Sequence, residues 1–280
     1  MPLAGIILDW LLYSAVWIAT CAVALSIESA LILQTSFPSW HLLLFAWTST
    51  FCHYNLHYFS REKHVALSGR DRWIGSHRPW FLPAILISGS ISLFCLLHFS
   101  WMELAAVAVM TAISMLYSLP LLPHGFRLKQ LGVFKPFILA AVWTIMTVWL
   151  PAHQADPLLL TLVIARRFVF MLILCLAFDL RDQHKDSVQG IRTIPVRWGA
   201  SFTYRLIDMQ LILFVVFAVL VEWQLHRWLM LLALLVSALL TKIAIRFTAQ
   251  RTSERYYLGV IDGMMMVQAL LVGLASLAQR

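Results

Sequence analysis

The sequence predicts an all-α membrane protein with nine transmembrane helices, and three observations support this prediction. Hydrophobic residues make up 61% of the 280 residues and charged residues only 12%, whereas soluble domains carry about 25% charged residues. Nine stretches approach the roughly 20 apolar residues that a helix needs to cross a bilayer. The basic residues alternate between the loops that would lie on the two sides of the membrane. Because lipid offers the backbone no hydrogen-bonding partners, we expect the spans to be helical.

The predicted spans are separated by residues that interrupt helices. They cover residues 5–33, 38–57, 81–99, 101–119, 134–151, 158–178, 202–222, 226–246 and 256–278. Breakers between them include Pro38, Pro120, Pro151 and Gly199. The first stretch lacks the basic n-region and the small-residue cleavage site of a signal peptide, so we expect it to remain as a span. No Gly/Ser-rich linker or low-complexity segment divides the sequence, which predicts a single domain over residues 1–280.

The distribution of Lys and Arg predicts the topology. Seventeen of the 21 basic residues lie in or beside the loops after spans two, four, six and eight, and the other four loops hold only Arg227. By the positive-inside rule the basic loops face the cytoplasm. This arrangement predicts a multi-pass protein of a bacterial-type inner (plasma) membrane, with the N-terminus in the cytoplasm and the C-terminus outside. The net charge of +8 therefore indicates membrane orientation, and we expect no nucleic-acid partner.

The four cysteines point to a packing role. Cys21, Cys52, Cys95 and Cys175 all lie inside apolar runs and are far apart in the sequence. Cysteines in such positions behave as small core residues, so we expect neither a disulfide framework nor a cysteine metal site.

Three carboxylates follow the sixth predicted span. Asp179, Asp182 and Asp186 are spaced by three and four residues, which puts them on one face of a helix. Like charges on one face repel unless a cation lies among them, and Mg²⁺ prefers oxygen ligands and often bridges carboxylate and phosphate. One interpretation is therefore a site for a lipid with a diphosphate head, with metal on the carboxylates and Lys or Arg on the phosphate. The alternative is a solvated helix end with Arg181 and Lys185 as neighbours.

The residues around these carboxylates form a longer motif. The run reads Asp179-x-x-Asp182-x-x-x-Asp186-x-x-x-Gly190-x-x-Thr193-x-Pro195. It resembles the second aspartate-rich motif of the UbiA superfamily of intramembrane prenyltransferases, with the spacing of the menaquinone branch. The segment after the family's fourth helix is similar to Tyr117-Ser118-x-Pro120, Arg127-x-Lys129, Lys135 and Trp143. The family's last helix is similar to Tyr256-Tyr257 with Asp262-Gly263, and nine spans is also the family's number.

The resemblance implies both a fold and a reaction. Members of the family have nine helices bundled around a central, lipid-accessible cavity, where aspartate-rich motifs on the second and sixth helices bind Mg²⁺ and a prenyl diphosphate. The diphosphate leaves, and the allylic cation alkylates an aromatic or other lipophilic acceptor in quinone or isoprenoid biosynthesis. For this chain the resemblance implies catalytic and metal-binding roles for Asp179, Asp182 and Asp186. It implies substrate-binding roles for Asn55, Glu62, Lys63, Tyr117, Ser118, Arg127, Lys129 and Arg181.

The first motif departs from the family pattern. The family reads Asn-Asp-x-x-Asp-x-x-x-Asp, and the matching stretch here keeps Asn55 but has Leu56, Phe59 and Lys63 at the aspartate positions. Glu62 can share a helix face with Asn55, so one carboxylate is retained. These changes predict a single Mg²⁺ ion, with Lys63 or Arg61 in place of a second cation.

The sequence leaves two further classes of function open. A non-catalytic lipid-binding or scaffold protein that kept the fold and lost the reaction is the alternative that the altered first motif favours. A transporter is disfavoured, because the sequence has no internal repeat and no pair of interrupted helices in matching halves.

Arg166 and Arg167 lie within the sixth predicted span. An ionisable residue at membrane depth costs roughly 3 kcal/mol or more unless it faces the protein interior or a partner. The sequence leaves three interpretations open: contact with a polar group of the acceptor, an ion pair with Glu28 or another buried acid, or snorkelling of the side chains towards the interface.

Overall fold

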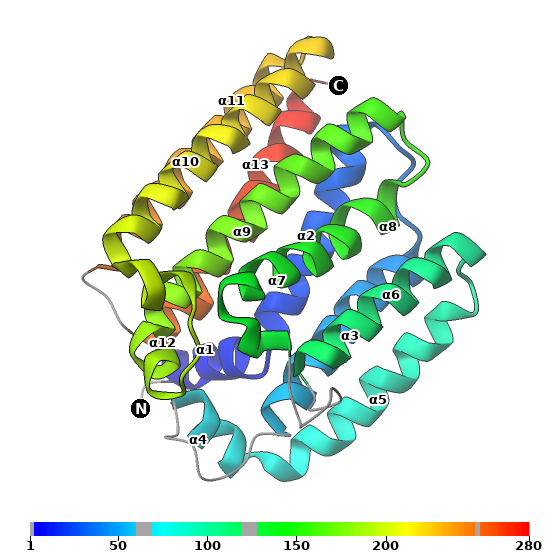
Figure 1. Cartoon of the computed structure of the whole chain (residues 1–280). Helices are drawn as coiled ribbons and strands as arrows, with labels where there is room; N and C mark the ends of the chain where they lie inside the picture. Colours follow the sequence, from blue (N-terminus) through cyan, green and yellow to red (C-terminus); the bar gives the residue numbers. More distant parts are fainter. Residues whose placement is uncertain (1–2, 60–68, 119–127, 250–252, 280) are drawn as a thin grey trace.

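The computed structural model of the chain describes residues 3–59, 69–118, 128–249 and 253–279, and every regular element in these ranges is a helix. The elements are α1 (Leu3–Tyr13), α2 (Val16–Leu33), α3 (Trp40–Phe59), α4 (Gly69–Ser76), α5 (Arg78–Leu96), α6 (Trp101–Ser118), η2 (Leu128–Phe134), α7 (Lys135–Thr144), η3 (Ile145–Trp149), α8 (Leu150–Ala152), α9 (Pro157–Val188), α10 (Ile194–Gln224), α11 (Trp228–Phe247), α12 (Glu254–Tyr256), η4 (Tyr257–Ile261) and α13 (Gly263–Ala278). The long helices run side by side, and the two termini lie at opposite ends of the bundle (Figure 1).

Seven helical stretches of the described chain are long and apolar enough to cross a membrane. They are 16–33, 78–96, 130–152, 157–188, 194–224, 228–247 and 254–278. The apolar helix over Trp101–Tyr117 is shorter. Helix α3 has 20 residues but carries three histidines and Asn55, and it does not belong to the seven. The all-helical fold is thus confirmed, and the count of nine spans stays a prediction.

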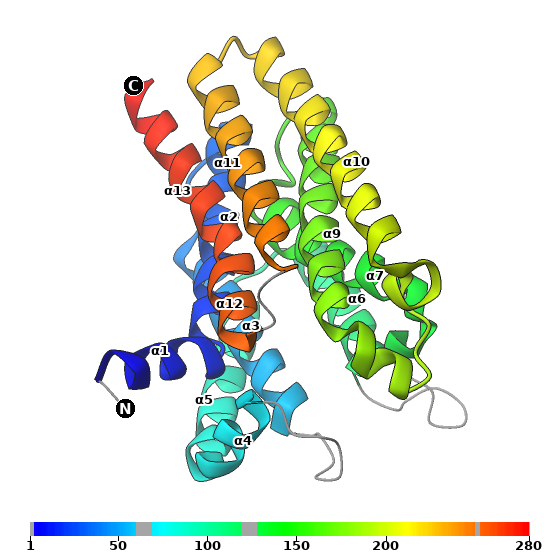
Figure 2. The ribbon, with the colours of Figure 1, turned by 90° about the vertical axis from the view of Figure 1, so that its left-hand side faces the viewer.

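The first predicted span is broken into two helices, so the prediction of one continuous span over residues 5–33 was wrong. Helix α1 ends at Tyr13, α2 begins at Val16, and Ala15 between them has a φ of 68°. Figure 2 shows α1 lying at a steep angle to α2. Contacts with later parts of the chain hold this bend: Arg255 pairs with Asp9 at 2.8 Å, and Trp10 packs edge-on against Trp73.

Helix α9 is the structural axis of the site. It begins with Asp156 as N-cap, whose side chain accepts hydrogen bonds from the backbone N–H groups of Leu158 and Leu159, and with Pro157 in the first turn. It then continues for 32 residues to Val188. The helix therefore extends beyond the predicted apolar span of 158–178, and the three aspartates belong to the same rod.

The helices form a closed arrangement around the inner face of α9. Contacts link α9 to α10 and α7, α10 to α11, α11 to α13, α13 to α2, and α2 to η3. Helices α3, α5 and α6 lie to one side of α2 and α7 (Figure 1). Two π-helical turns occur in this arrangement: η3 between α7 and α8, and η4 between α12 and α13.

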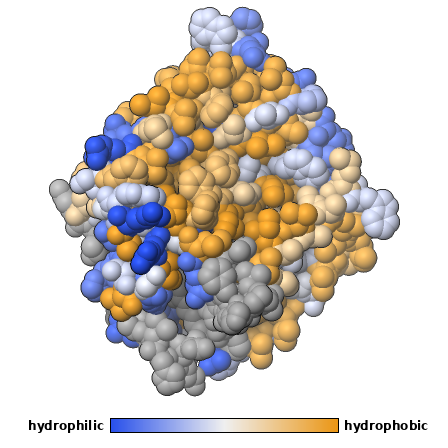
Figure 3. All heavy atoms as spheres, viewed as in Figure 1, coloured by the Kyte–Doolittle hydropathy of each residue, from blue (hydrophilic) through white to orange (hydrophobic). Residues whose placement is uncertain are grey.

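The outer surface is largely apolar. Many large hydrophobic side chains are exposed, among them Trp101, Leu97, Leu93 and Leu274. Apolar residues cover most of the face shown in Figure 3. Such a surface suits lipid contact far better than water, because soluble monomers rarely expose large contiguous apolar patches.

Candidate functional site

A cavity of about 210 Å³ opens at the end of the bundle where α9 terminates. Its walls come from α2, α3, α4, α6, α7, α9, η4 and α13. Asp179, Asp182 and Asp186 all line it. The helical spacing that placed them on one face therefore brings them to one concave surface.

The cavity changes from polar to apolar along α9. Its polar end contains four acidic and four basic side chains, so their formal charges cancel: Asp179, Asp182, Asp186, Asp262, Arg70, Lys135, Arg181 and Lys185. Towards the N-terminus of α9 the lining residues become Phe178, Cys175, Leu174 and Met171. A ligand with a charged head and an apolar tail matches this gradient.

Lys135 lies between two of the carboxylates. Its Nζ is 2.7 Å from Asp179 Oδ1 and 3.3 Å from Asp186 Oδ2. Asp179 and Asp186 are themselves buried. The ammonium group thus offsets most of the repulsion between two carboxylates that lie two helical turns apart.

Arg181 holds the third carboxylate. Its Nε and one terminal nitrogen donate to the two oxygens of Asp182 at 2.9 and 3.0 Å, in a bidentate pair. The guanidinium also lies over the rings of Phe178 and Tyr257, 4.8 and 5.3 Å from their centroids. Planar pairing and ring stacking together fix the orientation of Arg181.

The position of Lys135 depends on the segment that precedes it. In η2, Gly132 has a φ of +57°, and a Cβ at this residue would lie 2.3 Å from the backbone oxygen of Arg192. Only a glycine allows this close approach. Gly132 thereby allows the start of α7 to pack against the loop that follows α9.

Asp262 and Arg70 complete the polar end from distant parts of the chain. Asp262 follows the π-helical turn η4, where its backbone N–H donates to the carbonyl of Tyr257 at 3.0 Å. Such π-turns are frequent at functional sites. Arg70 of α4 is buried, and its Nε donates to the carbonyl of Tyr13 at 3.0 Å.

The predicted substrate-binding residues are distributed unevenly. Tyr117 and Arg181 line the cavity with the three aspartates. Asn55 is buried beside it, and its amide donates to the carbonyls of Ser14 and Phe51 at 2.8 and 2.9 Å. Asn55 is not one of the lining residues, whereas its neighbours Tyr54 and His57 are. Five other predicted residues, or their side chains, lie outside the described part of the chain: Glu62, Lys63, Ser118, Arg127 and Lys129.

The carboxylates fit a magnesium ion that is shared with a phosphate. Within the described ranges, no three His, Cys, Asp or Glu side chains converge as a self-sufficient metal cluster. Mg²⁺ is usually bound by one or two carboxylates together with substrate phosphates and waters. Asp179 Oδ2 is buried and has no hydrogen-bond partner among the described residues. The donor set therefore suits a metal that arrives with a phosphorylated ligand and not a protein-only cage.

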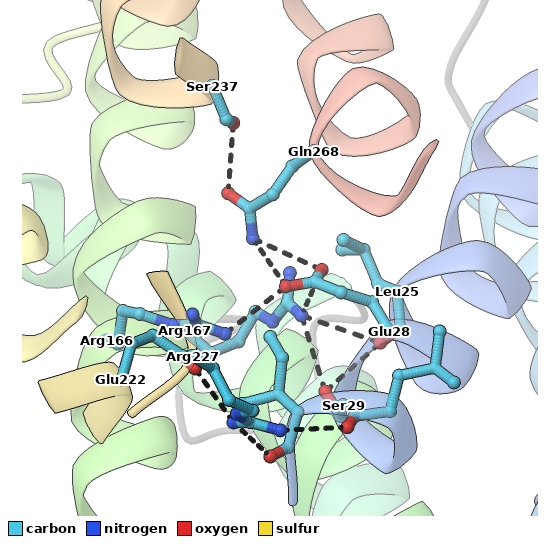
Figure 4. Close-up of polar contacts among 11 residues, drawn as sticks. Leu25, Glu28, Ser29, Arg166, Arg167, Glu222, Arg227, Ser237 and Gln268 are labelled. Carbon is cyan, nitrogen blue, oxygen red and sulfur yellow. Dashed lines mark hydrogen bonds and ion pairs between the residues drawn. The ribbon is translucent and has the colours of Figure 1, made fainter. Parts of the chain in front are cut away.

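The two arginines of the sixth predicted span belong to a separate, fully buried cluster. Arg166 and Arg167 pair with Glu28 of α2 at 3.2 and 2.6 Å. Gln268 of α13 donates to both oxygens of Glu28, and Glu222 of α10 pairs with Arg227 close by (Figure 4). None of these residues lines the cavity. The prediction of a pair with Glu28 is confirmed.

Four charged lining residues have no site role in the prediction from the sequence: Arg70, Lys135, Lys185 and Asp262. Lys135 and Asp262 appear in segments that resemble the family, but the resemblance assigns neither of them a role. Arg70 lies in the loop after the second predicted span, where it supports only the prediction of topology. Its burial is the signal that a sequence does not carry, because exposed and buried loop arginines look alike.

Comparisons with known proteins agree with this geometry. The model of the UbiA prenyltransferase family matches residues 80–257, more than half of the chain. This range contains the three aspartates and Lys135. No curated protein matches the sequence.

Several solved structures share the fold. A UbiA homolog from Archaeoglobus fulgidus bound to GPP and Mg²⁺ matches with a TM-score of 0.66 and 12% identity, over 95% of this chain and 98% of that chain. A structure from work on digeranylgeranylglyceryl phosphate synthase gives 0.62 and 12%, over 99% and 98%. The apo form of a UbiA homolog from Aeropyrum pernix K1 gives 0.61 and 14%, over 94% and 98%.

The family match and the apolar helices establish an integral, multi-pass membrane protein. The similarity to the solved structures supports the same fold, and the predicted resemblance is confirmed. This chain belongs to the UbiA prenyltransferase family.

Proposed function

We propose that this protein binds a prenyl diphosphate together with Mg²⁺ and transfers the prenyl group to an aromatic or other lipophilic acceptor. The observation that carries the proposal is the cavity along α9, which has three aspartates and basic side chains at one end and apolar residues at the other. Structures of the Archaeoglobus fulgidus homolog with GPP and Mg²⁺ and with DMAPP and Mg²⁺ support it.

The polar end would hold the head of the substrate. Asp179, Asp182 and Asp186 would bind a single Mg²⁺ that also contacts the diphosphate, and this ion would neutralise charge on the leaving group. Lys135 and Arg181 would donate to the phosphate oxygens. Other predicted contacts come from Asn55, Glu62, Lys63, Tyr117, Ser118, Arg127 and Lys129.

The reaction would proceed by loss of the leaving group. The bond between C1 of the prenyl chain and the diphosphate oxygen breaks, and its electron pair leaves with the diphosphate. An electron pair of the acceptor then forms the new bond to C1, and the acceptor gives up a proton. The aromatic faces of Tyr117, Trp143 and Phe178, which line the cavity, can stabilise the allylic cation and exclude water.

We further propose that the protein lies in a bacterial-type inner membrane with its N-terminus in the cytoplasm. The distribution of basic residues supports this orientation. It puts the polar end of the cavity on the side where water-soluble diphosphates are made.

Binding in lipid nanodiscs tests the proposal. Labelled dimethylallyl diphosphate should bind the wild type in Mg²⁺ and lose most of that affinity in EDTA. The double variant Asp182→Asn/Asp186→Asn should abolish the Mg²⁺-dependent part, whereas Asp208→Asn, which removes a surface partner of Arg246, should leave it unchanged. Unaltered binding in the double variant would place the site elsewhere.

The alternative is a lipid-binding protein that has lost the reaction. The observations in its favour are Leu56, Phe59 and Lys63 at the aspartate positions of the first motif and Lys135 between two carboxylates. An assay with Mg²⁺, labelled prenyl diphosphates and a crude lipid extract, followed by mass spectrometry of the products, separates the two. Binding without any prenylated product would favour the non-catalytic protein.

A further inference from the structure

The depth of the cavity sets a limit on the tail of its ligand. On α9, the lining runs from Asp179 to Met171, and on α7 it runs from Lys135 to Trp143. Each of these stretches spans eight residue steps, so each measures about 12 Å along its helix axis. Because Lys135 pairs with Asp179, the two helices start from one level and reach the same depth.

The volume is consistent with this limit. An apolar cavity of about 150 Å³ accommodates benzene, and this cavity measures about 210 Å³. With carbon–carbon bonds of about 1.5 Å, one isoprene unit extends roughly 5 Å. Two units thus fill the 12 Å between the carboxylates and Met171, and a third unit would reach beyond it.

A buried polar cross-link lies directly below this floor. Arg167 is one helical turn from Met171 on α9, and its guanidinium pairs with Glu28 of α2 at 2.6 Å. Gln268, three residues beyond Met265 on α13, donates to the same carboxylate at 2.9 Å. Figure 4 shows the three side chains meeting between their helices. A longer tail that continued along α9 would have to separate α2, α9 and α13 at a fully buried ion pair, where removing one partner is strongly destabilising.

We infer that the cavity selects prenyl diphosphates with tails of ten carbons or fewer, and that Met171 is the residue that sets this limit. The inference rests on the proposed function, since it assumes that the diphosphate binds at the polar end of the cavity. The Glu28–Arg167–Gln268 cross-link keeps the space below Met171 closed and is a positioning element, because it does not touch the ligand.

A competition series tests the limit. Prenyl S-thiolodiphosphates with 5, 10, 15 and 20 carbons, which ionise slowly, displace labelled dimethylallyl S-thiolodiphosphate from the protein in Mg²⁺-containing nanodiscs. Empty nanodiscs correct each free concentration for partition into lipid. The inhibition constant should fall at least about tenfold from 5 to 10 carbons, because apolar surface becomes buried, and should not fall further at 15 or 20.

Two variants of the floor residue sharpen the test. Met171→Ala should improve binding of the 15-carbon compound by about tenfold, since five carbons gain space, with little change for five carbons. Met171→Trp should weaken binding of the 10-carbon compound by a similar factor and leave binding of the 5-carbon compound unchanged. Met230→Ala, at a buried methionine outside the cavity lining, is the matched control and should reproduce the wild-type series.

The outcomes separate the inference from the proposed function. Wild-type affinity that keeps rising to 20 carbons, or a series that Met171→Ala and Met171→Trp leave unchanged, would overturn the length limit while leaving the diphosphate site intact. Failure of every member of the series to bind would overturn the proposed function, and the inference with it.

Discussion

Lys135 Nζ lies 2.7 Å from Asp179 Oδ1 and also within 3.3 Å of Asp186, so a fixed lysine occupies the place where the sequence predicted a metal ion. A divalent cation and this ammonium repel each other at such range. Binding of Mg²⁺ with a diphosphate therefore requires the ammonium to leave the carboxylates, and the phosphate is its natural new partner. The lysine therefore opposes the binding of Mg²⁺ alone and favours the binding of the diphosphate.

Removal of this lysine should separate the two effects. In Lys135→Ala we expect Mg²⁺ alone to bind about tenfold more tightly, because a competing positive charge is gone. Diphosphate binding should weaken by about 1.5–3 kcal/mol, the range for a hydrogen bond to a charged group. Calorimetry with Mg²⁺ and with dimethylallyl diphosphate measures both changes. Lys242→Ala, at a half-exposed lysine that pairs with Asp208, should alter neither, and parallel weakening of both ligands would refute the exchange.

Gly132 should tolerate no side chain, because it keeps α7 against the loop after α9. Gly132 and Gly190 both have positive φ, but a Cβ at Gly190 meets open space whereas one at Gly132 meets the carbonyl of Arg192. Gly190→Ala should cost about 1–2 kcal/mol of unfolding free energy from the left-handed conformation alone. Gly132→Ala should cost a further 1–3 kcal/mol or so from the clash and should also weaken diphosphate binding, since Lys135 is displaced. Unfolding titrations in detergent measure the difference, and equal losses would contradict the packing argument.

Glu28 should matter for stability and not for head-group binding. It is the shared partner of Arg166 and Arg167 and is fully buried. Glu28→Gln leaves two buried guanidinium groups uncompensated, so we expect a loss of about 3–5 kcal/mol in unfolding free energy. Asp208→Asn, which breaks an exposed pair with Arg246, should cost less than about 1 kcal/mol. The double variant Glu28→Gln/Arg167→Met should lose less than the sum of the single variants, and a strictly additive result would exclude a direct coupling.

Local patterns in the sequence were sufficient for much of the fold. Apolar runs between breakers predicted helices, and offsets of three and four residues predicted that Asp179, Asp182 and Asp186 share a face. The energetic cost of a buried charge predicted a partner for Arg166 and Arg167, and Glu28 is that partner. Each of these inferences needs only neighbouring residues or a general cost.

The features that were missed depend on tertiary contacts. No proline or glycine marks the bend at Ala15, which is held by contacts of α1 with α4 and with residues near α12. Lys135 and Asp262 reach the site from elements that are 44 and 83 residues from Asp179 in the sequence. Their convergence follows from the closure of the bundle, and no local period encodes it.

Topology can be tested separately from the fold. In a variant whose native cysteines are replaced, single cysteines at Arg72, Val188 and Gln154, which are exposed, report the side of the membrane through an impermeant thiol reagent. The seventeen-to-one distribution of basic residues predicts labelling of positions 72 and 188 from the cytoplasmic side and of 154 from outside. Arg70 and Asp186 line one cavity, so positions 72 and 188 must share a side whichever way the bundle is inserted. Labelling of positions 72 and 188 from outside would therefore contradict only the predicted orientation. Labelling of the two positions from opposite sides would contradict the bundle itself.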